Sequence, residues 1–148
     1  MKKTVLWFLC TILSVVFFSC KERCCCEDYD LGIHIFIFDK DSCDLLNPNN
    51  PKGYKESEIA LYKDPDLKEK LFNVDVLPLD KDSIYCIHLM APMDYKENDK
   101  LCATSYLKLN DTTIDTIYTE ITETECSHTV SKIIYNGKDV DRSFTVVK

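Results

Sequence analysis

The stretch LGIHIFIF (Leu31–Phe38) decides how the chain is expected to fold. Its side chains alternate: Ile33, Ile35 and Ile37 lie on one side, and histidine and phenylalanine on the other, which is the two-residue period of a β-strand. Because both sides are largely apolar, we expect this strand to lie in the middle of a sheet. SIYCIHLM (Ser83–Met90) alternates in the same way and is predicted to be a second central strand.

Six further segments carry weaker strand patterns, rich in β-branched and aromatic residues. They are EIALYK (Glu58–Lys63), LFNVDVLPL (Leu71–Leu79), ATSYLKL (Ala103–Leu109), TIDTIYTEIT (Thr113–Thr122), VSKIIY (Val130–Tyr135) and SFTVV (Ser143–Val147). Short strands at near-regular spacing, without alternating helices, predict an all-β domain. We expect an antiparallel β-sandwich, Ig-like or related, with an open β-barrel as the alternative.

Two local signals complete the expected fold. Asn136-Gly137 is the dipeptide best able to take positive φ at both centres of a type I′ turn, so it predicts a hairpin between VSKIIY and the final strand. Pro65–Phe72 is the segment in which we expect a short helix, of as little as one turn.

The N-terminus has the pattern of a secretion signal. Met1-Lys2-Lys3 is followed by 14 uncharged, mostly apolar residues, Val5–Phe18. This run is shorter than the roughly 20 residues that span a membrane, and a charged stretch follows it. An uncleaved anchor helix is the alternative interpretation.

Phe17-Phe18-Ser19-Cys20 resembles the lipobox of bacterial lipoproteins, in the permissive form found in Bacteroides-type bacteria, although Phe17 stands where most lipoboxes carry leucine. The resemblance implies thioether lipidation of Cys20 and cleavage after Ser19, which would leave a stable tether of two or more fatty-acid chains such as palmitate. Residues 1–19 are then a signal peptide, residues 20–30 a flexible tether, and residues 31–148 a single β domain.

Several later segments are similar to a group of small Bacteroides-type lipoproteins that have no assigned function. The similar segments are FDKDSCDLLNPNNP (Phe38–Pro51), EIALY, YLKLNDTTIDTI and KIIYNGK. The resemblance implies the fold and the lipid anchor but no activity. Lys21-Glu22 and Glu27-Asp28 resemble surface-export signals of such lipoproteins, so we expect the protein at the bacterial outer membrane or cell surface.

The charge balance disfavours some partners. Of the 18 basic residues two lie in the first 19 positions, whereas all 25 acidic residues follow them, so the remainder carries 16 basic and 25 acidic residues and a net charge of −9. Such a chain is repelled by nucleic acid and by anionic lipid surfaces.

The cysteines leave alternatives open. Cys24, Cys25 and Cys26 are read as thiols in the tether, because zinc sites separate their ligands by a few residues; a metal or redox role is the alternative. The sequence does not decide how the other four pair. They are Cys43, Cys86, Cys102 and Cys126.

Asp39, Asp41 and Asp44 are candidates for a calcium site, because alternate carboxylates in a loop can converge on a hard cation. An EF-hand-like loop that starts at Asp39 would need glycine where Asp44 stands and glutamate where Asn50 stands. The competing interpretation is a turn in which Asp and Asn bond their own backbone.

His34, His88 and His128 are the histidines of the chain. The first two fall on the predicted central strands, where histidine is usually a hydrogen-bonded core residue. We therefore predict a non-catalytic binding or structural module for a protein or glycan partner, anchored to the membrane by its lipid, with no cofactor. The alternative is a small envelope hydrolase or thiol enzyme that uses a histidine with Cys86 or a carboxylate.

Overall fold

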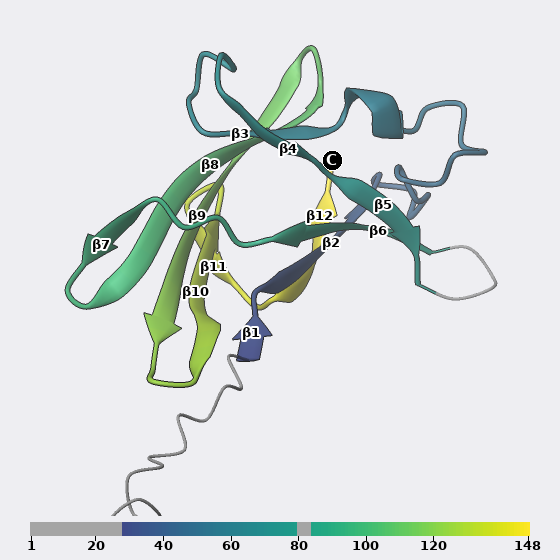
Figure 1. Cartoon of the computed structure of the whole chain (residues 1–148). Helices are drawn as coiled ribbons and strands as arrows, with labels where there is room; N and C mark the ends of the chain where they lie inside the picture. Colours follow the sequence, from purple (N-terminus) through teal and green to yellow (C-terminus); the bar gives the residue numbers. More distant parts are fainter. Residues whose placement is uncertain (1–27, 80–83) are drawn as a thin grey trace, which may run out of the picture.

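The computed structural model describes residues 28–79 and 84–148, whose strands form two sheets that face each other (Figure 1). The all-β class is confirmed, and the arrangement of a curled sheet against a second sheet is that of a sandwich or open barrel. In the described range the helical structure is one 3₁₀ turn, η1 (Glu56–Glu58). No helix in that range has the length and apolarity that a membrane span requires. Residues 1–27, with the predicted signal peptide and most of the predicted tether, lie outside it.

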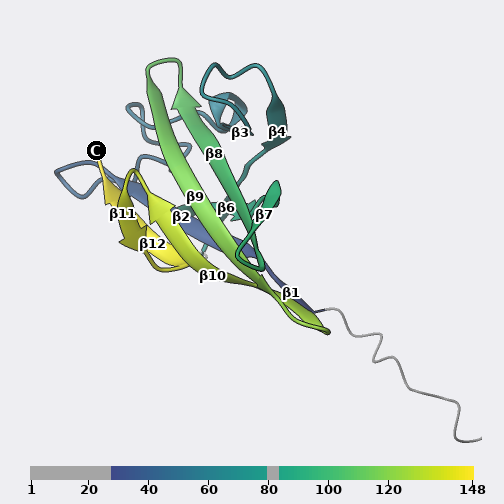
Figure 2. The ribbon, with the colours of Figure 1, turned by 90° about the vertical axis from the view of Figure 1, so that its left-hand side faces the viewer.

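Sheet A has eight strands and curls around one side of the core. Its main path runs in the order β1 (Asp28–Asp30), β10 (Ser127–Tyr135), β9 (Thr113–Glu123), β8 (Lys100–Asn110), β3 (Ala60–Tyr62), β4 (Lys70–Asn73). Two short strands add to it: β11 (Lys138–Val140) pairs with β10, and β7 (Tyr95–Glu97) pairs with β8. In Figure 2 the long strands β8, β9 and β10 lie in front of sheet B.

Sheet B has four strands, in the order β12 (Ser143–Val147), β2 (Gly32–Phe38), β6 (Tyr85–Met90), β5 (Asp75–Pro78). The two segments predicted to be central, β2 and β6, are its two inner strands, as expected. Most pairings are antiparallel, but β12 runs parallel to β2 and β1 runs parallel to β10. Both parallel strands lie at an edge of their sheet.

The isoleucine row of β2 lies at the centre of the core. Ile33, Ile35 and Ile37 have no exposed surface, and they belong to the same cluster as Leu107 and Ile117 of sheet A. Complete burial of one such side chain contributes about 1.5–3 kcal/mol. The row therefore joins the two sheets into one hydrophobic core.

The segment LFNVDVLPL forms two strands rather than the single one predicted. Val74, which is buried, separates β4 in sheet A from β5 in sheet B. Leu31 does the same between β1 and β2, so residues 28–30 of the predicted tether form a strand of sheet A. At each crossing the chain changes sheet while an apolar side chain stays in the shared core.

The short helix predicted at Pro65–Phe72 is wrong. The Asp64 carboxylate accepts hydrogen bonds from the backbone N–H groups of Lys68 and Glu69, and Leu67 has a positive φ of 56°. These contacts turn the chain back into β4, so side-chain capping of a loop replaces helical hydrogen bonds.

The Asn136-Gly137 turn is confirmed, with φ values of 48° and 79° at its two centres and Tyr135 paired with Lys138. Its second strand, however, is β11 and not the final strand. The chain leaves sheet A after β11 and enters sheet B as β12, beside β2.

A buried carboxylate connects the two sheets at this end of the molecule. Asp115 is 3% exposed, and it accepts hydrogen bonds from Tyr135 Oη at 2.5 Å and from Asn136 Nδ2 at 2.7 Å. Lys148, which follows β12, places its Nζ 2.6 Å and 2.7 Å from the two carboxylate oxygens. Burial and the Asp115 carboxylate raise the pKa of Tyr135, which keeps its hydroxyl protonated as the donor. Sheet B is thereby connected to strands β9 and β10 of sheet A.

Replacement of Asp115 by alanine should destabilise the fold strongly. It leaves the Tyr135 hydroxyl and the Lys148 ammonium without their acceptor in a largely buried setting, which costs about 3 kcal/mol. Asp111→Ala is the matched control, since Asp111 bonds Lys108 with its side chain 93% exposed, and its removal should change stability far less because solvent screens an exposed ion pair. Urea unfolding measures both variants. Equal losses of stability would contradict the role given to Asp115.

Candidate functional site

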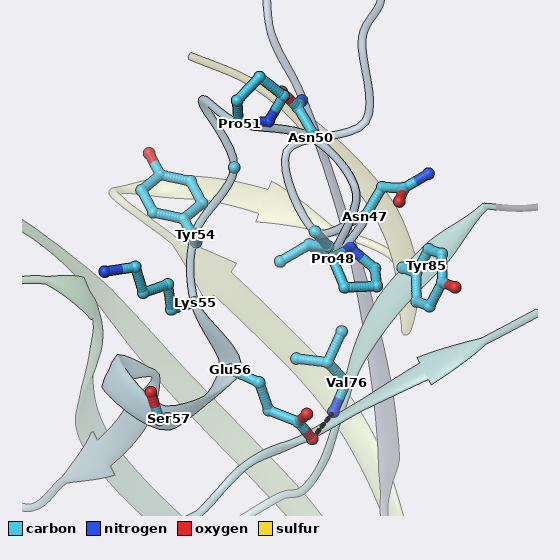
Figure 3. Close-up of a pocket in the computed structure, with 12 residues that line it drawn as sticks. Asn47, Pro48, Asn50, Pro51, Tyr54, Lys55, Glu56, Ser57, Val76 and Tyr85 are labelled. Atoms are coloured by element: carbon cyan, nitrogen blue, oxygen red, sulfur yellow. Dashed lines mark hydrogen bonds between the residues drawn. The ribbon is translucent and has the colours of Figure 1, made fainter.

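A cavity of about 540 Å³ opens between the loop that follows β2 and the edge of sheet B (Figure 3). This volume falls within the range of about 300–1,000 Å³ that small-ligand sites occupy. The lining comes from the loop and from one residue each of β5 and β6: Leu46, Asn47, Pro48, Asn50, Pro51, Gly53, Tyr54, Lys55, Glu56, Ser57, Val76 and Tyr85. We call it the loop pocket.

The loop is held in shape by the polar side chains of DLLNPNNP. Asp44 Oδ1 accepts from the Leu46 N–H at 2.8 Å, Asn47 Oδ1 from the Asn49 N–H at 2.9 Å, and Asn50 Oδ1 from the Lys52 N–H at 3.0 Å. Asn50 Nδ2 also donates to the Asp44 carbonyl at 2.8 Å. Successive Asx turns of this kind fix the backbone without any regular secondary structure.

Gly53 allows the loop to close. A Cβ atom there would lie 2.9 Å from the Leu45 carbonyl oxygen and 3.1 Å from that of Asn50, both of which are backbone atoms. The next residue, Tyr54, donates its N–H to the same Leu45 carbonyl at 2.7 Å. The tight closure therefore places the Tyr54 ring at one side of the pocket.

Tyr85 is placed on the other side by a second contact of Asp44. The Asp44 Oδ2 atom accepts from the Tyr85 N–H at 2.8 Å, so one carboxylate joins the loop to the start of β6. In Figure 3 the rings of Tyr54 and Tyr85 lie on opposite sides of the pocket, with Pro48 and Val76 between them. Both tyrosines are half-buried and keep part of their surface open to solvent.

Glu56 closes the lower side of the pocket at the edge of sheet B. Its Oε1 atom accepts from the Val76 N–H at 3.4 Å, as the dashed line in Figure 3 marks. β5 is the last strand in the order of sheet B, and Pro78, two residues further on, has no N–H to offer. A capped N–H and a proline both oppose the addition of another strand at an edge. The edge is thus better suited to a compact ligand than to an extended peptide.

Asp39, Asp41 and Asp44, the three aspartates of the calcium hypothesis, do not form a metal-binding group in the described residues. Asp39 Oδ1 accepts from the backbone N–H groups of Asp41 and Cys43, at 2.9 Å and 2.8 Å, and both oxygens of Asp44 are used as described above. In residues 28–79 and 84–148 no group of three or more His, Cys, Asp or Glu side chains is arranged to hold a metal ion. The competing interpretation of this segment, a turn bonded to its own backbone, describes these contacts.

The histidines of the two central strands meet. His34 and His88 are directly opposite each other in β2 and β6, with His88 Nδ1 3.1 Å from His34 Nε2. Burial lowers the pKa of His34, and the nearby charges of His88 and Arg142 lower it further. His128 lies elsewhere, in β10, where its ring stacks on Tyr29 with centroids 4.9 Å apart.

Cys86 precedes His88 by two residues and is 2% exposed. Burial, and then the Asp44 carboxylate, raise the pKa of its thiol, the opposite of the shift that activates a nucleophilic cysteine. The four cysteines of the described range are free thiols: Cys43 and Cys126 are exposed, and Cys86 and Cys102 are buried. Cys20, Cys24, Cys25 and Cys26 lie outside that range.

The loop-pocket residues Tyr54, Glu56 and Tyr85 were not among the candidates from the sequence. DLLNPNNP predicts a turn, but the pattern does not say that the turn packs against Tyr85 at the start of β6, 41 residues further along the chain. The sequence signal that could have pointed to the pocket is the presence of Tyr54 and Tyr85 next to segments rich in Asp, Asn and Pro. Such segments predict loops of fixed shape, but they do not predict which strands those loops pack against.

Comparisons with models of protein families, with curated proteins and with solved structures give no match for this chain.

Replacement of Gly53 by alanine should unfold the loop pocket locally. The new methyl group meets three backbone carbonyls that cannot rotate away, those of Leu45, Asn47 and Asn50, and we expect a loss of about 1–3 kcal/mol. Gly32→Ala is the control, because its nearest neighbour is a side-chain atom at 3.4 Å, and should change stability by less than about 1 kcal/mol. Hydrogen exchange of the Tyr54 and Tyr85 amides measures whether the loop stays closed, because both N–H groups donate to loop atoms and should exchange faster once it opens. Unchanged protection in Gly53→Ala would contradict this account.

Proposed function

We propose that the protein is a lipid-anchored, non-catalytic binding protein of the bacterial outer membrane or cell surface, and that its loop pocket receives a glycan. The observation that carries the proposal is the loop pocket itself: a concave, well-fixed site with tyrosines on two sides. The proposed anchor is the lipid on Cys20.

The mixture of side chains supports a glycan. Tyrosine and proline rings provide flat apolar surfaces, while tyrosine hydroxyls remain able to form hydrogen bonds. Around them stand Lys55, Glu56 and Ser57: the Lys55 ammonium pairs with Glu58 at 3.5 Å, the Glu56 carboxylate accepts from the Val76 N–H, and Ser57 offers a hydroxyl. A sugar ring presents both an apolar face and a rim of hydroxyls, so it complements such a lining better than a purely apolar ligand does.

The same lining supports binding rather than catalysis. It contains one carboxylate, Glu56, which caps a backbone N–H, and neither a histidine nor a cysteine. General acid–base catalysis of hydrolysis commonly uses two groups placed on either side of the bond that breaks. The buried Cys86 thiol, with its raised pKa, is also a poor nucleophile.

Removal of one tyrosine ring should weaken glycan binding. The detergent-solubilised full chain is screened on a glycan array, and the best ligand is titrated calorimetrically against Tyr54→Ala and Tyr85→Ala. We expect each to lose at least about tenfold in affinity, or ~1.4 kcal/mol, because a ring face of the loop pocket is lost.

Tyr54→Phe keeps the ring and should lose less than Tyr54→Ala. Tyr95→Ala is the control for the residue type, since Tyr95 is exposed on β7 in sheet A, and it should bind as the wild type does. Equal weakening in Tyr95→Ala would move the site to sheet A. A folded wild type that binds no glycan would reject this ligand class and leave a protein partner as the remaining one.

The anchor is tested separately by metabolic labelling with a clickable fatty acid. The wild type should be labelled, and Cys20→Ala should lose the label, because that thiol is the proposed acceptor of the lipid. Protease treatment of intact cells then reports whether the protein lies on the outside. Absence of label in the wild type would contradict the anchor, whereas label with full protection would place the domain inside the envelope.

A further inference from the structure

The outer face of sheet B carries a row of polar residues that the loop pocket does not use. Ser143, His34, His88 and Asp75 are directly opposite one another in β12, β2, β6 and β5, one residue from each strand. Residues opposite one another in neighbouring strands place their side chains on the same face, about 5 Å apart at Cβ. The row therefore crosses the whole sheet on the side away from the core.

The two histidines at the middle of this row are set for chelation. His88 Nδ1 and His34 Nε2 are 3.1 Å apart. With metal–nitrogen bonds of about 2.0–2.1 Å, this separation corresponds to an N–metal–N angle of about 95–100°. That value lies between the right angle of square-planar or octahedral coordination and the tetrahedral angle. The two nitrogens are at hydrogen-bond distance, and one ion can bind both of them in place of the proton between them.

Gly32 lies beside both rings on the outer face of β2. It stands two residues before His34 on the same face of β2, and a Cβ there would lie 3.4 Å from His88 Cε1 and 4.0 Å from His34 Cε1. The two imidazoles thus lie over a position that has no side chain. Both histidines are half-buried, so solvent and small ions reach them from the outer side.

We infer that His34 and His88 form a binding site for one divalent transition-metal ion on the outer face of sheet B. Imidazole pairs suit copper, nickel and zinc, and the general affinity order predicts tighter binding of Cu²⁺ than of Zn²⁺. The inference does not depend on the loop pocket or on the proposed glycan.

Two imidazoles supply only part of the coordination of such an ion. No third His, Cys, Asp or Glu stands close enough within the described residues, so water fills further positions. Asp75 is a candidate for a third ligand, since it is exposed and directly opposite His88, and side-chain rotation can bring its carboxylate closer. The positive charge of Arg142, which lies near His34, is offset by its ion pair with Asp30.

The site is tested on the full chain in detergent after accessible thiols have been alkylated, so that cysteine does not bind the probe. Calorimetric titration with Zn²⁺, and then with Cu²⁺, should give one saturable equivalent. His34→Gln and His88→Gln should each weaken binding by at least about tenfold, because even outer-shell partners of metal ligands contribute that much. His128→Gln is the matched control and should bind as the wild type does.

Circular dichroism without metal shows whether each variant is folded. If either glutamine variant is unfolded, ¹⁵N spectra of the wild-type imidazoles test the site instead. Zn²⁺ should shift the signals of the ring nitrogens of His34 and His88 and leave those of His128 unchanged. No saturable equivalent in the wild type would overturn the inference. So would full binding by His34→Gln and His88→Gln, or an equal loss in His128→Gln.

Discussion

The rest of the structure depends on the complete burial of the isoleucine row Ile33, Ile35 and Ile37 in β2. Because side chains in a strand alternate between faces, a shift of one residue would place His34 and Phe36 in the core and expose all three isoleucines. The cost would be several kcal/mol, since each isoleucine contributes about 1.5–3 kcal/mol when buried. The register of β2 is thereby fixed, and with it the registers of β6 and β12, which pair with it on either side. His34 meets His88 for this reason.

The two sheets stay together because the chain passes between them more than once. Leu31 and Val74 are buried at two of these crossings, and Asp115 with Lys148 joins the sheets near the end of β12. A chain that changes sheet at buried apolar residues cannot slide one sheet over the other without exposing those residues. The loop between β2 and β3 is a further crossing from sheet B to sheet A: its Leu45 and Leu46 belong to the shared core, and the residues between them and β3 line most of the loop pocket. Its own Asx turns give it a fixed shape.

The alternation of side chains was sufficient to predict the class of the fold and the two central strands. The same reasoning could not predict that LFNVDVLPL divides at Val74, because the segment has the strand pattern throughout and only the position of the two sheets separates its halves. It also could not predict that SFTVV pairs in parallel with β2, since Asn136-Gly137 specifies a hairpin but not its second strand. The loop pocket was missed for a related reason. Its parts, Tyr54 and Tyr85, are joined by the contact of Asp44 with β6, which local patterns do not contain.

Strands β5 and β6 carry residues of the loop pocket on one face and residues of the histidine row on the other. In β5, Val76 lines the pocket and the adjacent Asp75 lies on the outer face. In β6, Tyr85 lines the pocket and His88 lies on the outer face. The two-residue period of a strand separates these side chains although they share the same backbone. A substitution in the histidine row therefore changes the outer face without removing a pocket side chain, and a substitution of Tyr85 does the reverse. Any coupling between the two would have to act through the backbone that they share, and the paired strands on either side of β6 hold that backbone in place.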